Sequence, residues 1–444
     1  MADSYLTITP SAGNRRLFTI SFWVKRSKIT SSQMIVWAVA NKFRIEFGAD
    51  DTLIVRDYGS GYDINLITTR LFRDTTSWYH IVVAVDTAQA AEANRVKIYV
   101  NGEQETKFDT ATYPAINFDS NGWNTAGVHD MGREVAGTAY LEGQLAHFHG
   151  IDGTAYAAST FGETDSTTGE WKPILAPSVT YGSEGFFLKF ENSGALGTDS
   201  SGNGNNWTVN GSLKQSISTV TNNFATFDLN QSYNFDIIMG GTGISSSSGA
   251  WNGTNINYGM LKGKWYAEFK CVSGTYRGIG FFRYGGEYCA DVTHESVNSG
   301  MYPEGYFYKA DQKQLANNNS ETTYASWSAI SDGDILMLAL DLDNGKAWYG
   351  VNGTWNDAGS GTGVPNTGAF PHHTFTTGTG NFWGVSAGGH TSPVIHANFG
   401  EGRFGTTALA SANNDNAGAA KGTFEYAPPA GFYSICTDNI KEYG

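Results

Sequence analysis

Paired carboxylates are the first residues of this sequence that could do chemistry. Glu163 and Asp165 stand two positions apart in the segment ETDSTTGE. Hydrolysis of a glycosidic bond needs two carboxyl groups that flank the bond. The segment is rich in Thr, Ser and Gly, a composition typical of a solvent-facing loop. We therefore favour a solvated loop over a glycosidase site, and we expect the chain not to be an enzyme.

Histidines could hold a metal ion. His147 and His149 are two positions apart on an expected strand, so their side chains should share one face. No third His or Cys stands at ligand spacing, and zinc sites use three or four protein ligands. We expect these two side chains to pack at a surface or an interface. His372 and His373 are adjacent and are expected in an exposed loop.

The cysteines are expected to be chemically inert. No activating His or basic cluster stands beside any of them in the sequence, so buried thiols are the default interpretation. A count of three is odd and sparse and predicts no disulfide framework. The residues are Cys271, Cys289 and Cys436.

One loop carries the ligand chemistry of calcium. Asp199, Asn203 and Asn205 place oxygen atoms around two glycines in the stretch DSSGNGNN. Ca²⁺ takes six to eight hard oxygen ligands from flexible loops. The alternative is an Asn/Gly turn held by its own side chains, without any cation. We favour this alternative, and no cofactor is expected to be required.

Tryptophans in or beside polar segments are candidates for a glycan or partner contact. An exposed aromatic ring can stack on a sugar ring, whereas packing in a core or an interface is the commoner use of Trp. These residues are Trp123, Trp171, Trp251, Trp327 and Trp355.

Composition limits the class of protein. The chain has 444 residues, enough for two domains of ordinary size, with 55 Gly, 10 Pro and 14% aromatic residues. This mixture predicts β-structure with many tight turns. A net charge of −14 argues against nucleic-acid partners and against attraction to anionic membranes. No run of residues is apolar enough to predict membrane insertion, and the first residues do not resemble a signal peptide.

Short segments in which apolar and polar residues alternate, as in half-buried strands, recur along the chain. A first β-rich block covers residues 1–213, residues 214–250 are rich in Ser, Thr, Asn and Gly and are predicted as a packed linker, and a second β-rich block covers residues 251–444. In the first block we predict strands at 17–26, 34–40, 42–47, 52–58, 77–86, 95–100, 140–150 and 185–192. In the second block we predict strands at 263–272, 276–283, 304–310, 381–388 and 393–400, with a meander from Asp334.

Two Val-Asn-Gly sequences close hairpins in the two blocks. The first follows the alternating strand VKIYV at Asn101-Gly102, and the second follows KAWYGV at Asn352-Gly353. A type I′ turn needs positive φ at both central residues, which Asn tolerates and Gly prefers. The same turn in both blocks indicates either a repeated domain or two folds with one turn chemistry.

The first block resembles the laminin-G-like, concanavalin A-like jelly-roll sandwiches. The matching pieces are FTISFWVK, WYHIVVAVD with VKIYVNGE, LEGQLAHFHGIDG and GTDSSGNGNNWTVNG. Glycosidases of that fold carry the pattern E-x-D-x-x-E. Here Thr168 stands where the third carboxylate should follow Glu163 and Asp165, which supports the prediction of no activity.

The second block resembles SPRY domains, which are β-sandwiches of a different topology. The matching pieces are KWYAEFK, GIGFF, GDILMLALDLDNGKAWYGVNGTW and IHANFGEGRFG. We therefore expect two unrelated antiparallel β-sandwiches that use the same kind of Asn-Gly hairpin turn. The resemblance implies partner binding through loops near residues 284–297 and 313–327.

The pair of domains resembles structural proteins of tailed bacteriophages, especially marine ones. This resemblance implies a virion-surface protein, made in the bacterial cytoplasm and displayed as a head decoration, a knob or a tail-associated fibre component. Its expected partners are other virion proteins, further copies of itself and host surface glycans. Two alternatives stay open: a secreted or cell-surface lectin, and a polysaccharide-degrading glycoside hydrolase.

Overall fold

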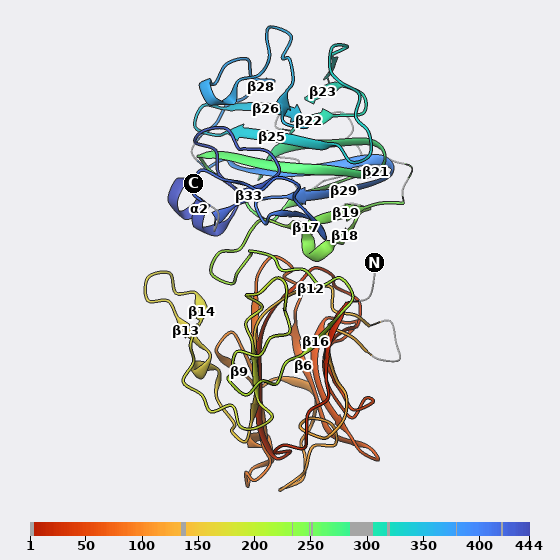
Figure 1. Cartoon of the computed structure of the whole chain (residues 1–444), viewed down its shortest axis with the longest axis vertical. Helices are drawn as coiled ribbons and strands as arrows, with labels where there is room; N and C mark the ends of the chain where they lie inside the picture. The colour runs from red at the N-terminus through yellow and green to blue at the C-terminus, as the bar shows by residue number, and fades with distance from the viewer. Residues whose placement is uncertain are drawn as a thin grey trace. The chain divides into compact units, whose positions relative to one another are not determined.

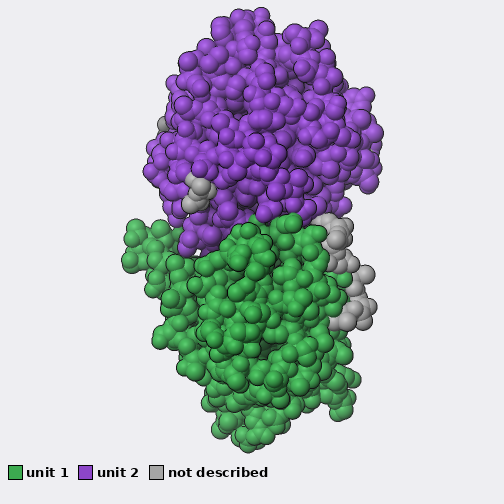
Figure 2. All heavy atoms as spheres, viewed as in Figure 1, with its two compact units in different colours: residues 1–215 green, residues 216–444 purple. Residues whose placement is uncertain are grey.

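The computed structural model describes residues 4–134, 139–232, 234–247, 249, 252–284, 305–317, 320–378, 380–418 and 421–444 (Figure 1). The chain divides into two compact units, residues 1–215 and 216–444 (Figure 2). Antiparallel strands form nearly all regular structure in both units, so the predicted all-β class is confirmed. Where the chain is described, its helices are too short and too polar to cross a membrane.

The first unit contains two large antiparallel sheets and a separate two-stranded sheet of β13 and β14. One has eight strands in the order β10-β6-β5-β4-β3-β11-β1-β16, and the other has six in the order β15-β12-β2-β7-β8-β9. The strands described in this unit are β1 (Tyr5–Ile8), β2 (Leu17–Arg26), β3 (Gln33–Ala38), β4 (Phe43–Phe47), β5 (Thr52–Tyr58), β6 (Tyr62–Leu71), β7 (Tyr79–Asp86), β8 (Val96–Val100), β9 (Glu103–Glu105), β10 (Phe108–Thr112), β11 (His129–Met131), β12 (Gly143–Asp152), β13 (Gly162–Thr164), β14 (Trp171–Pro173), β15 (Phe186–Leu188) and β16 (Thr208–Asn210).

Alternation along these strands builds the core of the first unit. Alternate residues of β4 and of the first part of β5 are buried apolar side chains, as at Ile45 and Val55. The same holds for β7 and β8, where Val83 and Ile98 belong to the same buried cluster. Because the two sheets contribute to one cluster, the unit is a β-sandwich. Short 3₁₀ turns, η1 (Glu92–Asn94) and η2 (Ala158–Thr160), connect its strands.

Both Asn-Gly turns adopt the predicted conformation. Asn101 and Gly102 have φ of 49° and 87°, and Asn352 and Gly353 have φ of 48° and 81°. A side chain at position 102 would also clash, because a Cβ there would lie 2.7 Å from the ring of Trp171. The turns belong to differently built units, so they share turn chemistry without a repeated domain.

The second unit is organised around two long strands. Its described strands are β17 (Phe227–Ser232), β18 (Asp236–Ile238), β19 (Gly243–Ser245), β20 (Asn252–Ile256), β21 (Lys264–Tyr284), β22 (Gly305–Lys309), β23 (Gln314–Asn317), β24 (Ser320–Thr323), β25 (Ile335–Asp341), β26 (Lys346–Val351), β27 (Thr354–Trp355), β28 (His373–Thr374), β29 (Phe382–Asn398), β30 (Arg403–Phe404), β31 (Thr407–Ala408), β32 (Asn413–Asn414) and β33 (Thr423–Phe424). Its helical turns are η3 (Met239–Gly241), η4 (Pro365–Thr367) and the C-terminal helix α2 (Thr437–Tyr443).

Bends in β21 and β29 fold one sheet into two layers. The two strands run side by side along their length (Figure 1), and both bend where Gly274, Tyr276, Thr391 and Ser392 have positive φ. The first half of β21 pairs with β25, whereas its second half pairs with β22. We predicted each long strand as two, and the structure joins them because their mutual pairing continues through the bend.

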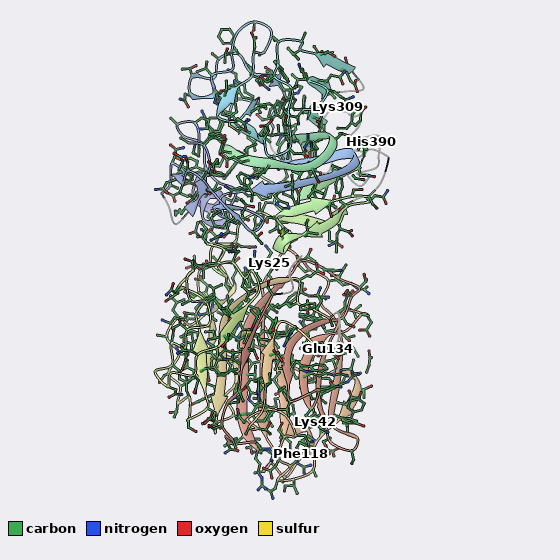
Figure 3. The ribbon with its side chains drawn as sticks, turned by 45° about the vertical axis from the view of Figure 1, so that its right-hand side comes forward. Lys25, Lys42, Phe118, Glu134, Lys309 and His390 are labelled. Atoms are coloured by element: carbon green, nitrogen blue, oxygen red, sulfur yellow. The ribbon has the colours of Figure 1, made fainter. Side chains whose placement is uncertain are left out.

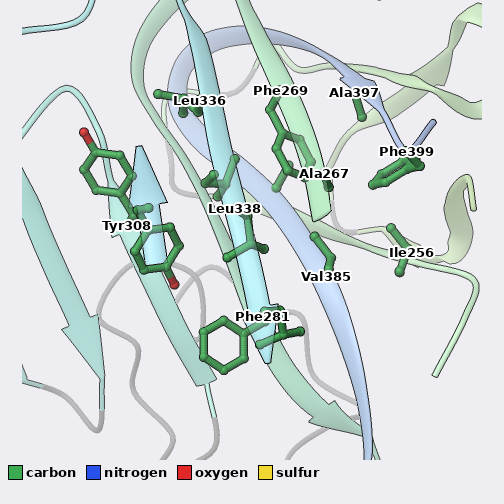
Figure 4. Close-up of a cluster of buried hydrophobic side chains, with 14 of the residues drawn as sticks. Ile256, Ala267, Phe269, Phe281, Tyr308, Leu336, Leu338, Val385, Ala397 and Phe399 are labelled. Carbon is green, nitrogen blue, oxygen red and sulfur yellow. The ribbon is translucent and has the colours of Figure 1, made fainter. Parts of the chain in front are cut away.

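The core of the second unit lies between these layers. Phe269 and Phe281 come from the two halves of β21, Leu338 comes from β25 and Val385 from β29, and all are fully buried (Figure 4). Burial of such side chains is the main favourable term in folding.

Most of the predicted linker belongs to the second unit. β17 pairs with β20, and β19 pairs with both β18 and β29. Phe224, Phe227, Ile237 and Ile244 are buried, and burial of these four apolar side chains holds a polar segment in the sheet. The prediction of a linker over residues 214–250 is therefore wrong from residue 216 onward.

Candidate functional site

The predicted carboxylate pair lies on the hairpin of β13 and β14. Asp165 accepts N–H groups from Thr167 and Thr168 and pairs with Lys172 at 3.0 Å. These donors hold the pKa of the Asp165 carboxyl well below its ordinary value. Glu163 is exposed and lies 3.6 Å from the same Lys172. The Asp165 carboxyl is therefore not placed to stay protonated as a general acid.

The two predicted histidines are separated by a bulge. His147 has a φ of 44°, and the pairing of β12 with β2 shifts between Ala146 and His149. The His149 ring stacks on Phe187 at 3.9 Å, and its Nδ1 lies 3.0 Å from the Tyr181 hydroxyl. Among the residues that the structure describes, no group of three His, Cys, Asp or Glu side chains could hold a metal ion.

A buried serine–histidine contact lies on the outer face of the six-stranded sheet. Ser21 Oγ is 2.9 Å from His80 Nε2, and Trp171 Nε1 donates to His80 Nδ1 at 2.9 Å. Because Nδ1 accepts from the indole, the ring proton sits on Nε2 and is donated to Ser21. Burial also lowers the pKa of His80 to about 3. The imidazole therefore cannot take the Ser21 proton, and the pair is no catalytic dyad.

The other predicted reactive groups are buried. Cys271 and Cys436 are buried free thiols, as predicted, and burial raises the pKa of Cys271 to about 12. Cys289 lies outside the described residues. His372 is only 8% exposed and accepts the Tyr349 N–H on Nδ1, so the prediction of an exposed loop is wrong for this residue.

Two of the predicted tryptophan contacts are wrong because the side chains are in the core. Trp123 and Trp327 are 2% and 4% exposed and pack among other aromatic rings. Trp171 is half-buried, and a Cβ at Gly162 would lie 2.6 Å from its ring, so that ring is already covered. Trp355 is half-buried against Tyr266. Trp251 lies outside the described residues.

The proposed calcium loop satisfies its own polar groups. Asp199 accepts the N–H groups of Phe187, Ser201 and Asn205, and also the Ser201 hydroxyl, at 2.8–2.9 Å. The side-chain amides of Asn203 and Asn205 donate to backbone carbonyls of residues 182–185. This arrangement favours the alternative of a turn held by its own side chains.

Removal of calcium tests this interpretation of the loop. Since the Asp199 carboxylate already has four donors, we expect the thermal midpoint of the chain to be the same in excess calcium and in excess chelator. Differential scanning calorimetry in the two buffers measures it. A midpoint that rises with calcium, and no longer does so in Asp199→Asn, would restore the calcium site.

A continuous polar row crosses the outer face of the eight-stranded sheet. Strand register places one residue of each strand directly beside the next, and the apolar neighbours of these residues face the core. From β16 to β10 the members of this polar row are Thr208, Thr7, Asp130, Trp37, Arg44, Arg56, Asn65 and Thr112. Strands lie about 4.8 Å apart, so the polar row repeats at that spacing.

Side chains of opposite charge pair along the polar row. Glu46, two residues after Arg44 on β4, lies 3.4 Å from Arg44 and 3.3 Å from Arg56. Asp130 lies 3.2 Å from Arg133, a residue that follows β11. Burial raises the pKa of both Glu46 and Asp130. Sequence analysis missed this face, because its members come from eight strands and meet only through long-range register.

The predicted SPRY-type loops are described only in part. Residues 285–297 of the first loop lie outside the described residues. The second, residues 313–327, contains the exposed strand β24 and ends at the buried Trp327.

One family profile and two solved structures that resemble this chain each match a part of it. No curated protein sequence matches it. The chain is similar to the crystal structure of the SPRY domain of human HERC1, with 17% identity over 38% of this chain and 96% of that one and a TM-score of 0.29. It is also similar to the TRIM65 PSpry domain, with 13% identity over 39% of this chain and 88% of that one and a TM-score of 0.29. Residues 1–154 match the laminin G profile described as the Concanavalin A-like lectin/glucanases superfamily, which confirms the resemblance expected for the first domain.

Proposed function

We propose that this chain is a non-enzymatic structural protein on the surface of a tailed-bacteriophage particle. The observation that carries the proposal is the pairing of a concanavalin A-like sandwich with a second β-sandwich whose sequence resembles SPRY domains. The predicted carboxylates are engaged in a hairpin, and the serine–histidine pair has the wrong tautomer for nucleophilic attack. Binding, and not bond cleavage, is the chemistry that these side chains support.

Protein contacts are the expected role of the second unit. Its sequence resemblance implies docking of other virion proteins, and the chain would be displayed in several copies as a head decoration, a knob or a tail-associated fibre component. Host surface glycans are the expected ligands of the first unit. Many copies on one particle would turn weak single-site binding into high avidity.

A lectin outside any virion is the second candidate. The observation that favours it is the match of residues 1–154 to a superfamily described by lectins and glucanases. Such a lectin would be secreted or held at a cell surface.

Protein composition of purified particles separates these candidates. We expect the chain to band with phage particles in a density gradient and to be quantified there by mass spectrometry in many copies per particle. Recovery only in the soluble or secreted fraction would contradict the virion proposal and favour the lectin. Release of reducing sugars from host polysaccharide by the pure chain would contradict the non-enzymatic part.

A further inference from the structure

We propose that residues 153–182 form a strap over the outer face of the six-stranded sheet, and that acid opens this strap by protonating the buried His80 that holds it. The strap contains η2, β13 and β14. Opening would uncover an apolar and aromatic sheet face that the closed strap hides. The inference does not depend on whether the chain is a virion protein or a lectin.

The strap packs on the six-stranded sheet through side chains and is not a part of that sheet. Its strands β13 and β14 pair with each other in a sheet of their own. Ala158 and Phe161 of the strap share a buried cluster with Val82 and Ile151 of the six-stranded sheet. Because side chains carry this contact, the strap can leave as a unit without breaking a strand pair of the six-stranded sheet.

Both ends of the strap are fixed to the six-stranded sheet by hydrogen bonds. Near the first end, Thr19 Oγ1 on β2 donates to the Thr154 carbonyl and accepts the Tyr156 N–H, each at 2.8 Å. Near the second end, the Tyr181 hydroxyl lies 3.0 Å from His149 Nδ1 on β12. The middle of the strap is therefore the part that can move while both ends stay in place.

Trp171 holds the middle of the strap to His80 on β7. A Cβ at Gly102 of the sheet or at Gly162 of the strap would lie 2.6–2.7 Å from the Trp171 ring, so the ring fits closely between them. Its Nε1–H donates to His80 Nδ1 at 2.9 Å. An indole N–H can only donate, so His80 Nδ1 has to be unprotonated while the strap is closed.

A second proton on His80 is incompatible with the closed strap. The Nε2–H faces Ser21 Oγ at 2.9 Å, so an added proton would sit on Nδ1 and point at the indole N–H. The ring is fully buried and stacks on Trp23 with ring centroids 4.6 Å apart, and burial lowers its pKa to about 3. In the open form water replaces the indole, and the pKa returns toward about 6.5. Since the closed form has the lower pKa, the strap is held fully above pH 6.5 and loses stability as the pH falls.

The ionisable neighbours of His80 do not favour a positive charge there in the closed strap. These neighbours are His147 and His149 on β12, Lys25 on the same face of β2 (Figure 3), and Glu163, Asp165 and Lys172 on the strap. His147 lowers the pKa of His80 further. Lys172 lies 3.0 Å and 3.6 Å from the two strap carboxylates and pairs with both. Protonation of His80 would therefore add a charge beside other cations, which opening relieves.

Hydrogen exchange of the full chain, followed by mass spectrometry, tests the proposal. Off the sheet, β13 and β14 would be an isolated two-stranded hairpin, which is at best marginally stable in water, so their amides exchange when the strap opens. Exchange rates are corrected for the intrinsic effect of pH and give the opening equilibrium. One proton bound on opening should raise this equilibrium about twentyfold between pH 7 and pH 5. Amides of the core strands β4 and β5 should stay protected at pH 5.

Replacements that do not titrate isolate the role of His80. His80→Gln and His80→Asn both keep a hydrogen-bonding amide, and whichever retains the native circular dichroism should show a rise about twentyfold smaller. His129→Gln, which removes another buried histidine of the first unit, should keep the full rise.

Three results would overturn the proposal. One is a native strap that exchanges equally at pH 5 and pH 7. Another is a rise that persists in full when His80 is replaced. The third is a rise that β4 and β5 share, because it would mean that the whole first unit unfolds and that the strap does not open by itself.

Discussion

Replacing Asp51 with Asn is expected to destabilise the first unit by about 3–5 kcal/mol. Asp51 and Arg26 are fully buried, and Oδ1 lies 3.1 Å from Arg26 Nη2. The same carboxylate accepts the Thr30 N–H and pairs with Arg73. Without its negative charge, the Arg26 guanidinium would keep the Phe72 carbonyl and the Phe47 ring but no counter-ion. A buried charge that loses its counter-ion is among the most costly defects of a folded protein.

The choice of Asn avoids a second effect. Asp51 has a φ of 69°, a conformation that Asn tolerates and Ala does not, so Asp51→Ala would add backbone strain to the loss of charge. Equilibrium unfolding in urea, fitted as two transitions for the two units, measures the change. The control is Asp119→Asn, which breaks an exposed pair with Arg16 and should change stability by less than about 1 kcal/mol. Equal effects of the two variants would contradict the buried-charge account.

Lowering the pH from 7 to 4.5 is expected to remove about 5 kcal/mol of stability from the first unit through two histidines. Burial lowers the pKa of His80 to about 3 and of His129 to about 4. In the unfolded chain both imidazoles titrate near 6.5. Since the folded pKa is the lower one, the stabilisation is complete above pH 6.5. It is lost as the pH falls, at about 1.4 kcal/mol per pH unit for each residue.

Other groups of the first unit change the size of this effect. His147 and His149 also have lowered pKa values because of burial, and they act in the same direction. Burial raises the pKa of Glu46, Asp57 and Asp130, so these carboxyl groups take up protons more readily in the folded unit and offset part of the loss.

A variant that lacks one histidine isolates the titration. Unfolding free energies of the native chain and of His129→Gln, measured from pH 7.5 to 4.5, should differ in slope by about one proton. His390→Gln, at the bend of the second unit (Figure 3), is the control and should leave the slope of the first unit unchanged. A native chain whose stability does not fall between pH 6.5 and 5 would contradict the account.

Local patterns in the sequence predict most of the strands that lie at a core. The bounds of β2 and β5 agree with the prediction, because alternating apolar residues there meet a clear turn at each end. β6 was missed although Ile64 and Leu66 alternate with polar residues in the same way. β20, the segment NGTNI, could not be found by pattern, because Asn, Gly and Thr are typical of turns and only pairing with β29 buries them.

Candidate sites were predicted less well than strands, because burial and register are tertiary properties. Trp123 and Trp327 stand in polar segments of the sequence, yet aromatic neighbours from distant segments enclose both. The polar row, in contrast, could not be predicted from the sequence. Arg44 and Arg56 look like ordinary solvent-facing residues of two strands, and only the order and register of eight strands bring them beside Trp37 and Asp130.

Immunogold electron microscopy of intact particles, with an antibody against this chain, tests the central claim most directly. The account predicts gold label on the particle surface. Label over the head would make the chain a decoration protein, and label on the tail would make it a knob or fibre component. Particles that carry no label, from a lysate in which the antibody detects the chain in soluble form, would contradict a virion role and leave the lectin as the better explanation.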